Sequence, residues 1–294
     1  MRLRDFLILV LVCLIWAASN VLGKIVVSDW GVPPLYFVAL RFLIVAAVTL
    51  PWLLPIPKPW WRMALIGLLM GAANFALLFI GLQTASPSAA GIVLQIGLPV
   101  TILLSVLVLG ERIGRRRALG IVLTFAGVMI VMWNPEGFMI STGLAFVAAS
   151  AAAGSVGGIM IKQMERMEPL RFQAWVAAMS LPPLAAGSII AETGQLEASL
   201  AVGWQFIAAL LFSALIVSVV AHTAFYRLIQ RYEANLLTPL TLMTPLATIG
   251  LGVLITGDRI DLRIATGSAI AFAGVLIVAV QRNRVAPETV PERA

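Results

Sequence analysis

Two nearly identical strings, "FAGVMIV" (125–131) and "FAGVLIV" (272–278), stand 147 positions apart in a chain of 294 residues. The same shift aligns "GERI" (110–113) with "GDRI" (257–260). One matched apolar string carries little weight by itself. Because a loop motif keeps the same register, the chain is expected to contain two copies of one structural unit.

The composition indicates that both copies lie in lipid. Hydrophobic residues make up 61% of the chain and charged residues 11%, and the mean hydropathy is +1.02. Soluble domains carry roughly 25% charged residues. Backbone groups inside a bilayer must be satisfied within helices or closed barrels, and the apolar runs do not alternate with period two. The expected fold class is therefore an all-α membrane protein.

Ten apolar runs are long enough, or nearly so, to span a hydrocarbon core that takes about 20 residues. They cover approximately 5–27, 35–54, 63–83, 87–109, 117–133, 141–161, 172–191, 203–225, 235–256 and 264–281. Five spans per copy is an odd number, so the second copy must enter the membrane from the opposite side. We therefore expect two five-helix inverted-topology repeats, residues 1–137 and 138–284, followed by a cytoplasmic tail, 285–294.

The positive charges predict the orientation. With both termini in the cytoplasm, cytoplasmic segments hold 16 of the 20 Lys and Arg residues, and Lys24, Arg259 and Arg263 lie outside, with Arg41 inside the second span. This asymmetry follows the positive-inside rule. It also explains the net charge of +7 by contact with anionic lipid headgroups. The lipid bilayer is thus an expected partner, nucleic acid is not, and the expected location is a bacterial inner membrane.

Several motifs resemble a known family. They are "WAASNVLGK" (16–24), "YFVALRF" (36–42), "GLQTASPSAAGIV" (81–93) and "LGER" (109–112), the last preceded by Pro99. The chain resembles the drug/metabolite transporter superfamily, EamA type, and within it the bacterial exporters of aromatic amino acids. This resemblance implies a ten-span carrier that works by alternating access. The second copy departs from the pattern, since "SAAAGSVGG" (150–158) has no aromatic or amide residue.

Two ionisable side chains inside the spans are candidate cavity residues, because buried charge in a membrane marks function by default. Arg41 could meet a substrate carboxylate, or it could pair with Asp29 or Asp258, which are predicted on the same side. His222 is the only histidine and titrates near neutral pH when unperturbed. It could line a cavity or pack as a hydrogen-bonded core residue.

Amide and aromatic side chains complete the candidate substrate site. The amides are Asn20, Asn74 and Gln95, and the aromatics are Trp16, Tyr36, Phe75, Phe79, Trp175 and Tyr226. Amides at similar depth could bind the charged ends of an amino acid, and the aromatics its side chain. Each amide could instead bond a neighbouring helix, and each aromatic could simply pack. Pro99 and Pro245 kink their helices, either as gate hinges or as static bends.

The sequence predicts a transporter rather than an enzyme. With one His and one Cys, and acids only near span ends, it offers no nucleophile–base pair, metal cluster or paired carboxylates. No catalytic residue, metal or cofactor is expected. We expect export of amino acids, including aromatic ones, and related small metabolites, without a carboxylate that carries protons. The alternative is a drug or lipid carrier on the same scaffold. A monomer or weak homodimer is expected.

Overall fold

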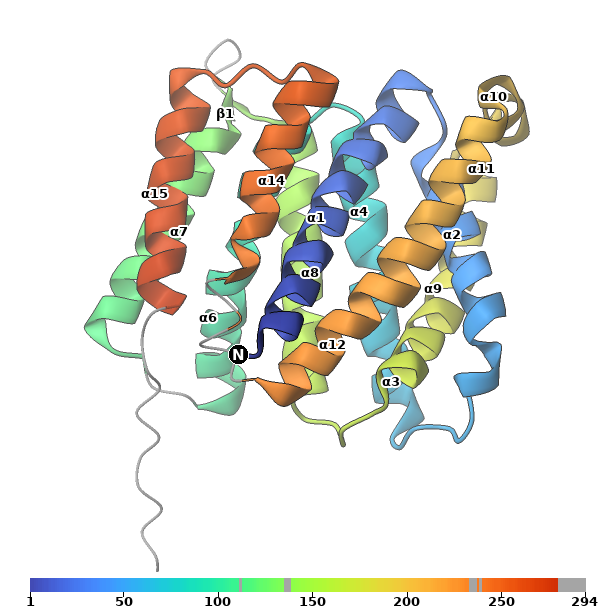
Figure 1. The fold of residues 1–294 in the computed structure, drawn as a ribbon, viewed down its shortest axis with the longest axis horizontal. Coiled ribbons are helices and arrows are strands. Elements are labelled where there is room, and N and C mark those ends of the chain that lie inside the picture. Colours follow the sequence, from blue (N-terminus) through green and yellow to red (C-terminus); the bar gives the residue numbers. More distant parts are fainter. Residues whose placement is uncertain (111–112, 135–138, 233–236, 238–239, 280–294) are drawn as a thin grey trace, which may run out of the picture.

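The structure is a computed structural model that describes residues 1–110, 113–134, 139–232, 237 and 240–279. Its long helical segments lie side by side and run between the two ends of one bundle (Figure 1). The helices are α1 (Leu3–Lys24), α2 (Pro34–Thr49), α3 (Trp60–Gly67), α4 (Asn74–Leu82), α5 (Pro87–Val93), α6 (Gly97–Leu109), α7 (Arg115–Met132), α8 (Thr142–Ile161), α9 (Pro169–Ala191), α10 (Gln195–Val202), α11 (Trp204–Leu211), α12 (His222–Arg231), α14 (Met243–Leu251) and α15 (Leu262–Ala279).

Short segments of altered winding join some of these helices into longer spans. Four are π-helical, η1 (Ile25–Asp29), η3 (Leu68–Ala73), η5 (Phe212–Ala221) and η6 (Gly252–Thr256), and two are 3₁₀ turns, η2 (Leu50–Trp52) and η4 (Leu94–Ile96). Eight of the resulting segments in the described part of the chain are long and apolar enough to cross a membrane. They are α1–η1, α2–η2, α3–η3–α4, α5–η4–α6, α8, α9, α11–η5–α12 and α15.

Two further segments occupy the positions of the fifth and ninth apolar runs. Helix α7 begins with three consecutive arginines, and α14 with η6 forms a shorter apolar segment, Met243–Thr256. The sequence did not predict α10 or the two-residue antiparallel strands β1 (Trp133–Asn134) and β2 (Met139–Ile140). The expected boundary at 137/138 and the tail 285–294 fall outside the described residues.

Proline and glycine mark several helix ends. Pro34, Pro87 and Pro169 occupy the first positions of α2, α5 and α9, where a missing backbone N–H costs nothing. The aligned glycines of "GERI" and "GDRI" end their helices in the left-handed region, with φ of 69° at Gly110 and 67° at Gly257. Glycine adopts this conformation without steric cost. The two copies of the loop motif thus share a backbone conformation as well as letters.

Helices α7 and α15, which carry the two FAGV strings, cross through paired glycines. A Cβ built on Gly127 would lie 2.5 Å from the carbonyl oxygen of Gly267, and one built on Gly120 would lie 2.7 Å from that of Gly274. The pairs run in opposite order along the two helices, so the contact is antiparallel. The 147-residue shift aligns Gly120 with Gly267 and Gly127 with Gly274. Each half therefore contributes the same surface to this contact.

The bundle is apolar both inside and outside. One large core of buried hydrophobic residues is centred on side chains such as Phe37, Phe79 and Ile66. On the outer surface, Ile190 is 84% exposed and Leu254 is 82% exposed. Contact between such an apolar surface and water would be unfavourable, whereas contact with lipid tails is not. The N-terminus lies at the same end of the bundle as the end of α12 and the start of α3 (Figure 1).

Candidate functional site

An interior pocket with a volume of ≈ 110 Å³ lies between helices of both halves. Its lining comprises Phe42, Met70, Asn74, Phe75, Gly154, Phe172, Gln173, Val176, Ser218, His222 and Tyr226. Four of these, Asn74, Phe75, His222 and Tyr226, were predicted as site residues. The pocket is smaller than the roughly 300 Å³ at the lower end of ligand pockets, so a solute larger than a few waters requires it to widen.

The two π-helical segments η3 and η5 shape the pocket walls. Met70 belongs to η3 and Ser218 to η5, and Asn74 and His222 are the first residues after these segments. Shifted by 147 positions, η3 falls within η5. A π-helical turn widens the backbone locally and is frequent at functional sites. The pocket therefore lies where both copies depart from α-helical winding.

Aromatic rings form much of the wall. Phe75 meets Phe42 edge to face with ring centroids 5.6 Å apart, and it meets His222 at 6.2 Å. Phe172 and Tyr226 form a second edge-to-face pair at 4.8 Å. Aromatic walls suit an apolar or aromatic ligand, because rings attract each other beyond simple area burial.

Trp16 extends this aromatic wall from α1. Its ring lies 5.3 Å from that of His222 and 4.7 Å from that of Phe225. The indole N–H of Trp16 is buried and has no hydrogen-bond partner. Tyr and Trp polar groups usually find a partner when buried, so this donor is free for a ligand.

Arg41 is the principal charge beside the pocket. Its side chain is fully buried, and its guanidinium lies 4.2 Å from the centre of the Phe75 ring. Nε donates to Ser218 Oγ at 2.9 Å, whereas both terminal nitrogens are buried without a hydrogen-bond partner. A buried charge without a counter-charge is costly. A carboxylate bound in bidentate fashion would satisfy both nitrogens.

The alternative interpretation, in which Arg41 pairs with Asp29 or Asp258, is wrong. Neither carboxylate lies within ion-pair distance of Arg41. Asp258 instead accepts hydrogen bonds from the backbone N–H of Ser88 at 2.9 Å and from the Thr256 hydroxyl at 2.8 Å. The carboxylate is held by a helix N-terminus, which favours negative charge, and it is unavailable to Arg41.

Polar side chains in the pocket are anchored by backbone carbonyl groups. Asn74 donates to the carbonyl oxygen of Ser150 at 2.8 Å, and Gln173 donates to that of Ser218 at 2.8 Å. A ring nitrogen of His222, Nδ1, lies 2.7 Å from the Val217 carbonyl oxygen. These bonds fix the orientation of each group, so the pocket presents a rigid polar pattern.

Seven predicted site residues do not line this pocket, although two of them, Trp16 and Arg41, contact residues that do. The other five lie elsewhere. Asn20 donates to the Thr248 hydroxyl at 3.4 Å, and Gln95 lies in η4. Tyr36 stacks on Phe206, with its hydroxyl 3.5 Å from that of Ser199. Phe79 is buried against Phe37 in the core, and Trp175 donates to the Leu53 carbonyl at 3.0 Å.

Pro99 and Pro245 lie just after matched irregularities. Pro99 follows the 3₁₀ turn η4, and α14 begins at Met243 after a turn at Leu242. A proline ring clashes with the carbonyl group four residues earlier, which for Pro99 belongs to Gln95 inside η4. The prolines thus account for the breaks in these two spans.

Sequence reasoning missed Phe42, Phe172, Gln173 and Ser218 as pocket residues. Ser218 could have been found, because Ser218, His222 and Tyr226 are spaced four residues apart and share one helix face. Phe172 and Gln173 carry no such signal within the sequence. Their position depends on how α9 packs against α12.

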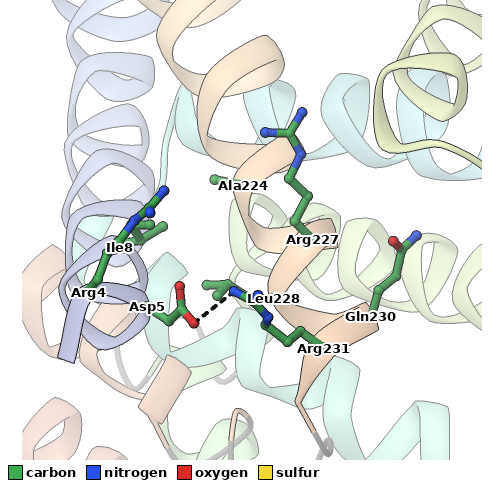
Figure 2. A pocket seen from close by; sticks show the side chains of 8 residues that line it. All are labelled: Arg4, Asp5, Ile8, Ala224, Arg227, Leu228, Gln230 and Arg231. Atoms are coloured by element: carbon green, nitrogen blue, oxygen red, sulfur yellow. Dashed lines mark hydrogen bonds and ion pairs between the residues drawn. The ribbon is translucent and has the colours of Figure 1, made fainter. Parts of the chain in front are cut away.

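A second hollow, of ≈ 520 Å³, lies between α1 and α12 near the N-terminus. Arg4, Asp5 and Ile8 line it from α1, and Ala224, Arg227, Leu228, Gln230 and Arg231 line it from α12 (Figure 2). Asp5 accepts from Arg231 at 3.2 Å and from the Tyr232 hydroxyl at 2.5 Å. Within the described ranges, His, Cys, Asp and Glu form no group of three or more that could hold a metal.

Comparison with known proteins gives concordant results along the whole chain. The sequence model of the EamA-like transporter family matches twice, over residues 4–133 and 141–280. A probable amino-acid metabolite efflux pump of Salmonella typhimurium is 25% identical over 290 residues, covering 94% of this chain and 95% of that protein. Its Escherichia coli namesake is also 25% identical, with the same coverage.

Two further comparisons give the same picture. The uncharacterized inner membrane transporter YedA of Escherichia coli is 26% identical over 279 residues, covering 90% of this chain and 87% of that protein. A crystal structure of a protein 21% identical to this chain superposes with a TM-score of 0.65, covering 95% of this chain and 99% of that one. The likeness in structure establishes a shared fold.

Proposed function

This chain belongs to the EamA-like transporter family, since two copies of the family model cover most of it, and we propose that it exports amino acids, including aromatic ones, from the bacterial cytoplasm. One observation carries the proposal. Arg41 is buried beside an aromatic pocket with two guanidinium nitrogens free of partners. This arrangement suits a solute that has a carboxylate at one end and an apolar side chain at the other.

The proposed binding mode assigns a role to each wall. The carboxylate bridges the terminal nitrogens of Arg41, and the solute side chain lies among Phe75, Phe172 and Tyr226. Asn74 and the ring of His222 face the amino group as polar neighbours. The names of two relatives, probable amino-acid metabolite efflux pumps, support the same solute class.

The proposed topology has ten spans in two inverted halves, residues 1–137 and 138–284, with both termini in the cytoplasm. The bias of Lys and Arg toward one side supports this orientation. The reversed glycine pairs between α7 and α15 support a two-fold axis in the membrane plane, as inverted-repeat carriers have. Alternating access then rocks the halves about the pocket, with Pro99 and Pro245 as proposed hinges.

We propose transport driven by the solute gradient alone. No acidic residue is among those that line the interior pocket, and Arg41 meets no carboxylate of the described chain. A drug or lipid carrier would suit a wholly apolar cavity, which Arg41, Asn74 and Gln173 do not provide.

The test is uptake of labelled L-phenylalanine by proteoliposomes without an ion gradient, comparing wild type with Arg41→Gln. Removing one partner of a buried charge pair costs about 2–5 kcal/mol, so kcat/KM should fall at least about 30-fold. Arg116→Gln is the matched control, because Arg116 is exposed at the start of α7. L-phenylalaninamide, which lacks the carboxylate, should not compete with wild-type uptake.

Folding of the Arg41→Gln variant is checked by its melting temperature in detergent. A folded variant that transports phenylalanine as well as Arg116→Gln would refute the role of Arg41. Wild-type uptake that depends wholly on a proton gradient would refute uncoupled transport.

A further inference from the structure

The hollow between α1 and α12 combines several cationic groups with one carboxylate. Arg4 on α1 and Arg227 on α12 both line the hollow, and their guanidinium groups lie on the same side of the Asp5–Arg231 pair (Figure 2). Both side chains are exposed, and neither forms an ion pair with another described residue. The lining contains three arginines, Arg4, Arg227 and Arg231, and one carboxylate, that of Asp5. The hollow therefore carries a net positive charge from its described residues.

The Asp5–Arg231 pair joins α1 to α12 at this hollow. The Asp5 side chain is 7% exposed and the Arg231 side chain is 58% exposed. Asp5 also accepts the Tyr232 hydroxyl bond at 2.5 Å, so it keeps a partner if Arg231 moves away. Arg231 is thus the more accessible member of the pair, and a second carboxylate could bind it from the solvent side.

The same two helices connect the hollow to the aromatic pocket. Asp5 and Trp16 are 11 residues apart on α1, a rise of about 16 Å at 1.5 Å per residue. On α12, His222 and Tyr226 line the pocket and Arg227 lines the hollow. Helix α12 therefore lines both cavities, and the seam between α1 and α12 runs from the hollow toward the contact of Trp16 with His222 at the pocket wall.

We propose that this hollow is a second oxyanion site, which binds the carboxylate of the solute before the solute reaches Arg41. The inference rests on the proposed export of amino acids and adds a residue set to it. Arg4 and Arg227 attract the carboxylate from water, and Arg231 joins them by leaving Asp5. Loss of the Asp5–Arg231 bond loosens the contact between α1 and α12, which opens the seam toward the pocket.

An anionic lipid headgroup presents the same oxyanion chemistry, and the experiment separates the two sources. Uptake of labelled L-phenylalanine is measured in vesicles of phosphatidylcholine alone and in vesicles with added phosphatidylglycerol, at low and high ionic strength. The variants are Arg4→Gln, Arg227→Gln and their combination, with Arg116→Gln as the matched loss of one exposed arginine.

In phosphatidylcholine vesicles, each single variant should raise KM about threefold and the pair about tenfold, as for exposed ion pairs, with kcat little changed. Wild-type KM should rise with salt, because exposed charges are screened, and the double variant should lose most of that dependence. A purely structural role would not change the salt dependence.

Three other results would overturn the inference in distinguishable ways. If wild type transports but the double variant matches Arg116→Gln in both KM and salt dependence, the hollow is no solute site and the proposed export stands. If the variants differ from wild type only in vesicles with phosphatidylglycerol, the hollow binds lipid. If wild type transports no amino acid, the proposed function fails and the inference fails with it.

Discussion

The glycine contact between α7 and α15 permits a sharp test of the paired-repeat architecture. In Gly127→Ala, the new Cβ would lie 2.4 Å from the Ala271 backbone nitrogen and 2.5 Å from the Gly267 carbonyl oxygen. Ordinary van der Waals contact begins at 3.4 Å, so the helices must separate by 3.4 − 2.4 = 1.0 Å. Both obstructing atoms belong to the backbone, so no side chain can rotate away.

Overpacking of this kind costs about 3 kcal/mol, the upper part of the usual range. Alanine regains about 1 kcal/mol of helix propensity over glycine, which leaves a net loss of about 2 kcal/mol. At roughly 2 °C per kcal/mol for a large domain, the melting temperature in detergent should fall by about 4 °C. Gly274→Ala should give the same loss, because its Cβ would lie 2.5 Å from the Thr124 backbone nitrogen.

The matched control is Gly158→Ala in α8, where a Cβ meets nothing within 4 Å. This control should melt at or above the wild-type temperature. The reasoning is refuted if Gly127→Ala melts no lower than Gly158→Ala, because the two helices would then be farther apart than the structure has them.

Three further predictions concern the site. Asp5→Asn removes the ion pair with α12, which is worth about 1 kcal/mol at most. The single cysteine, Cys13, is buried in α1 and should then react up to about fivefold faster with N-ethylmaleimide. An unchanged rate would show that the pair does not hold α1 in place. Asn74→Ala removes the bond to the α8 backbone, a loss of about 1 kcal/mol, and should raise KM for phenylalanine; an unchanged KM would remove Asn74 from the site. Pro99→Ala restores a backbone hydrogen-bond donor, so it should raise the melting temperature. If the bend is a hinge, kcat should also fall, whereas an unchanged kcat would identify a static bend.

Much of the fold could be predicted from the sequence, because lipid imposes few choices on an apolar chain. The eight long spans lie within a few residues of the expected runs. The repeat was visible in the two FAGV strings, although Gly120 and Gly267 were not recognised as part of it. Helix α10 and the β1–β2 pair were missed, since segments of a few residues leave no hydropathy signal.

The site was only partly predictable, for a physical reason. Depth in the membrane can be read from position along a span, but the direction of a side chain depends on helix rotation and packing. Asn20, Asn74 and Gln95 were predicted at similar depth, yet only Asn74 faces the interior pocket. The two π-helical segments η3 and η5 further change the directions of the side chains that follow them, and no residue type in the sequence predicts a π-helical segment. The absence of a partner at the terminal nitrogens of Arg41 depends on tertiary packing, in which Asp258 accepts a hydrogen bond from Ser88.

The burial of Arg41 also has a consequence for how the protein is made. Its Nε bonds to Ser218, which lies 177 residues later in the chain. At 5–20 residues per second, synthesis of that interval takes about 9 to 35 s. An arginine at the centre of a helix costs roughly 3 kcal/mol on translocon insertion. Until the span that carries Ser218 has been made, the Nε of Arg41 lacks the acceptor that it has in the folded protein.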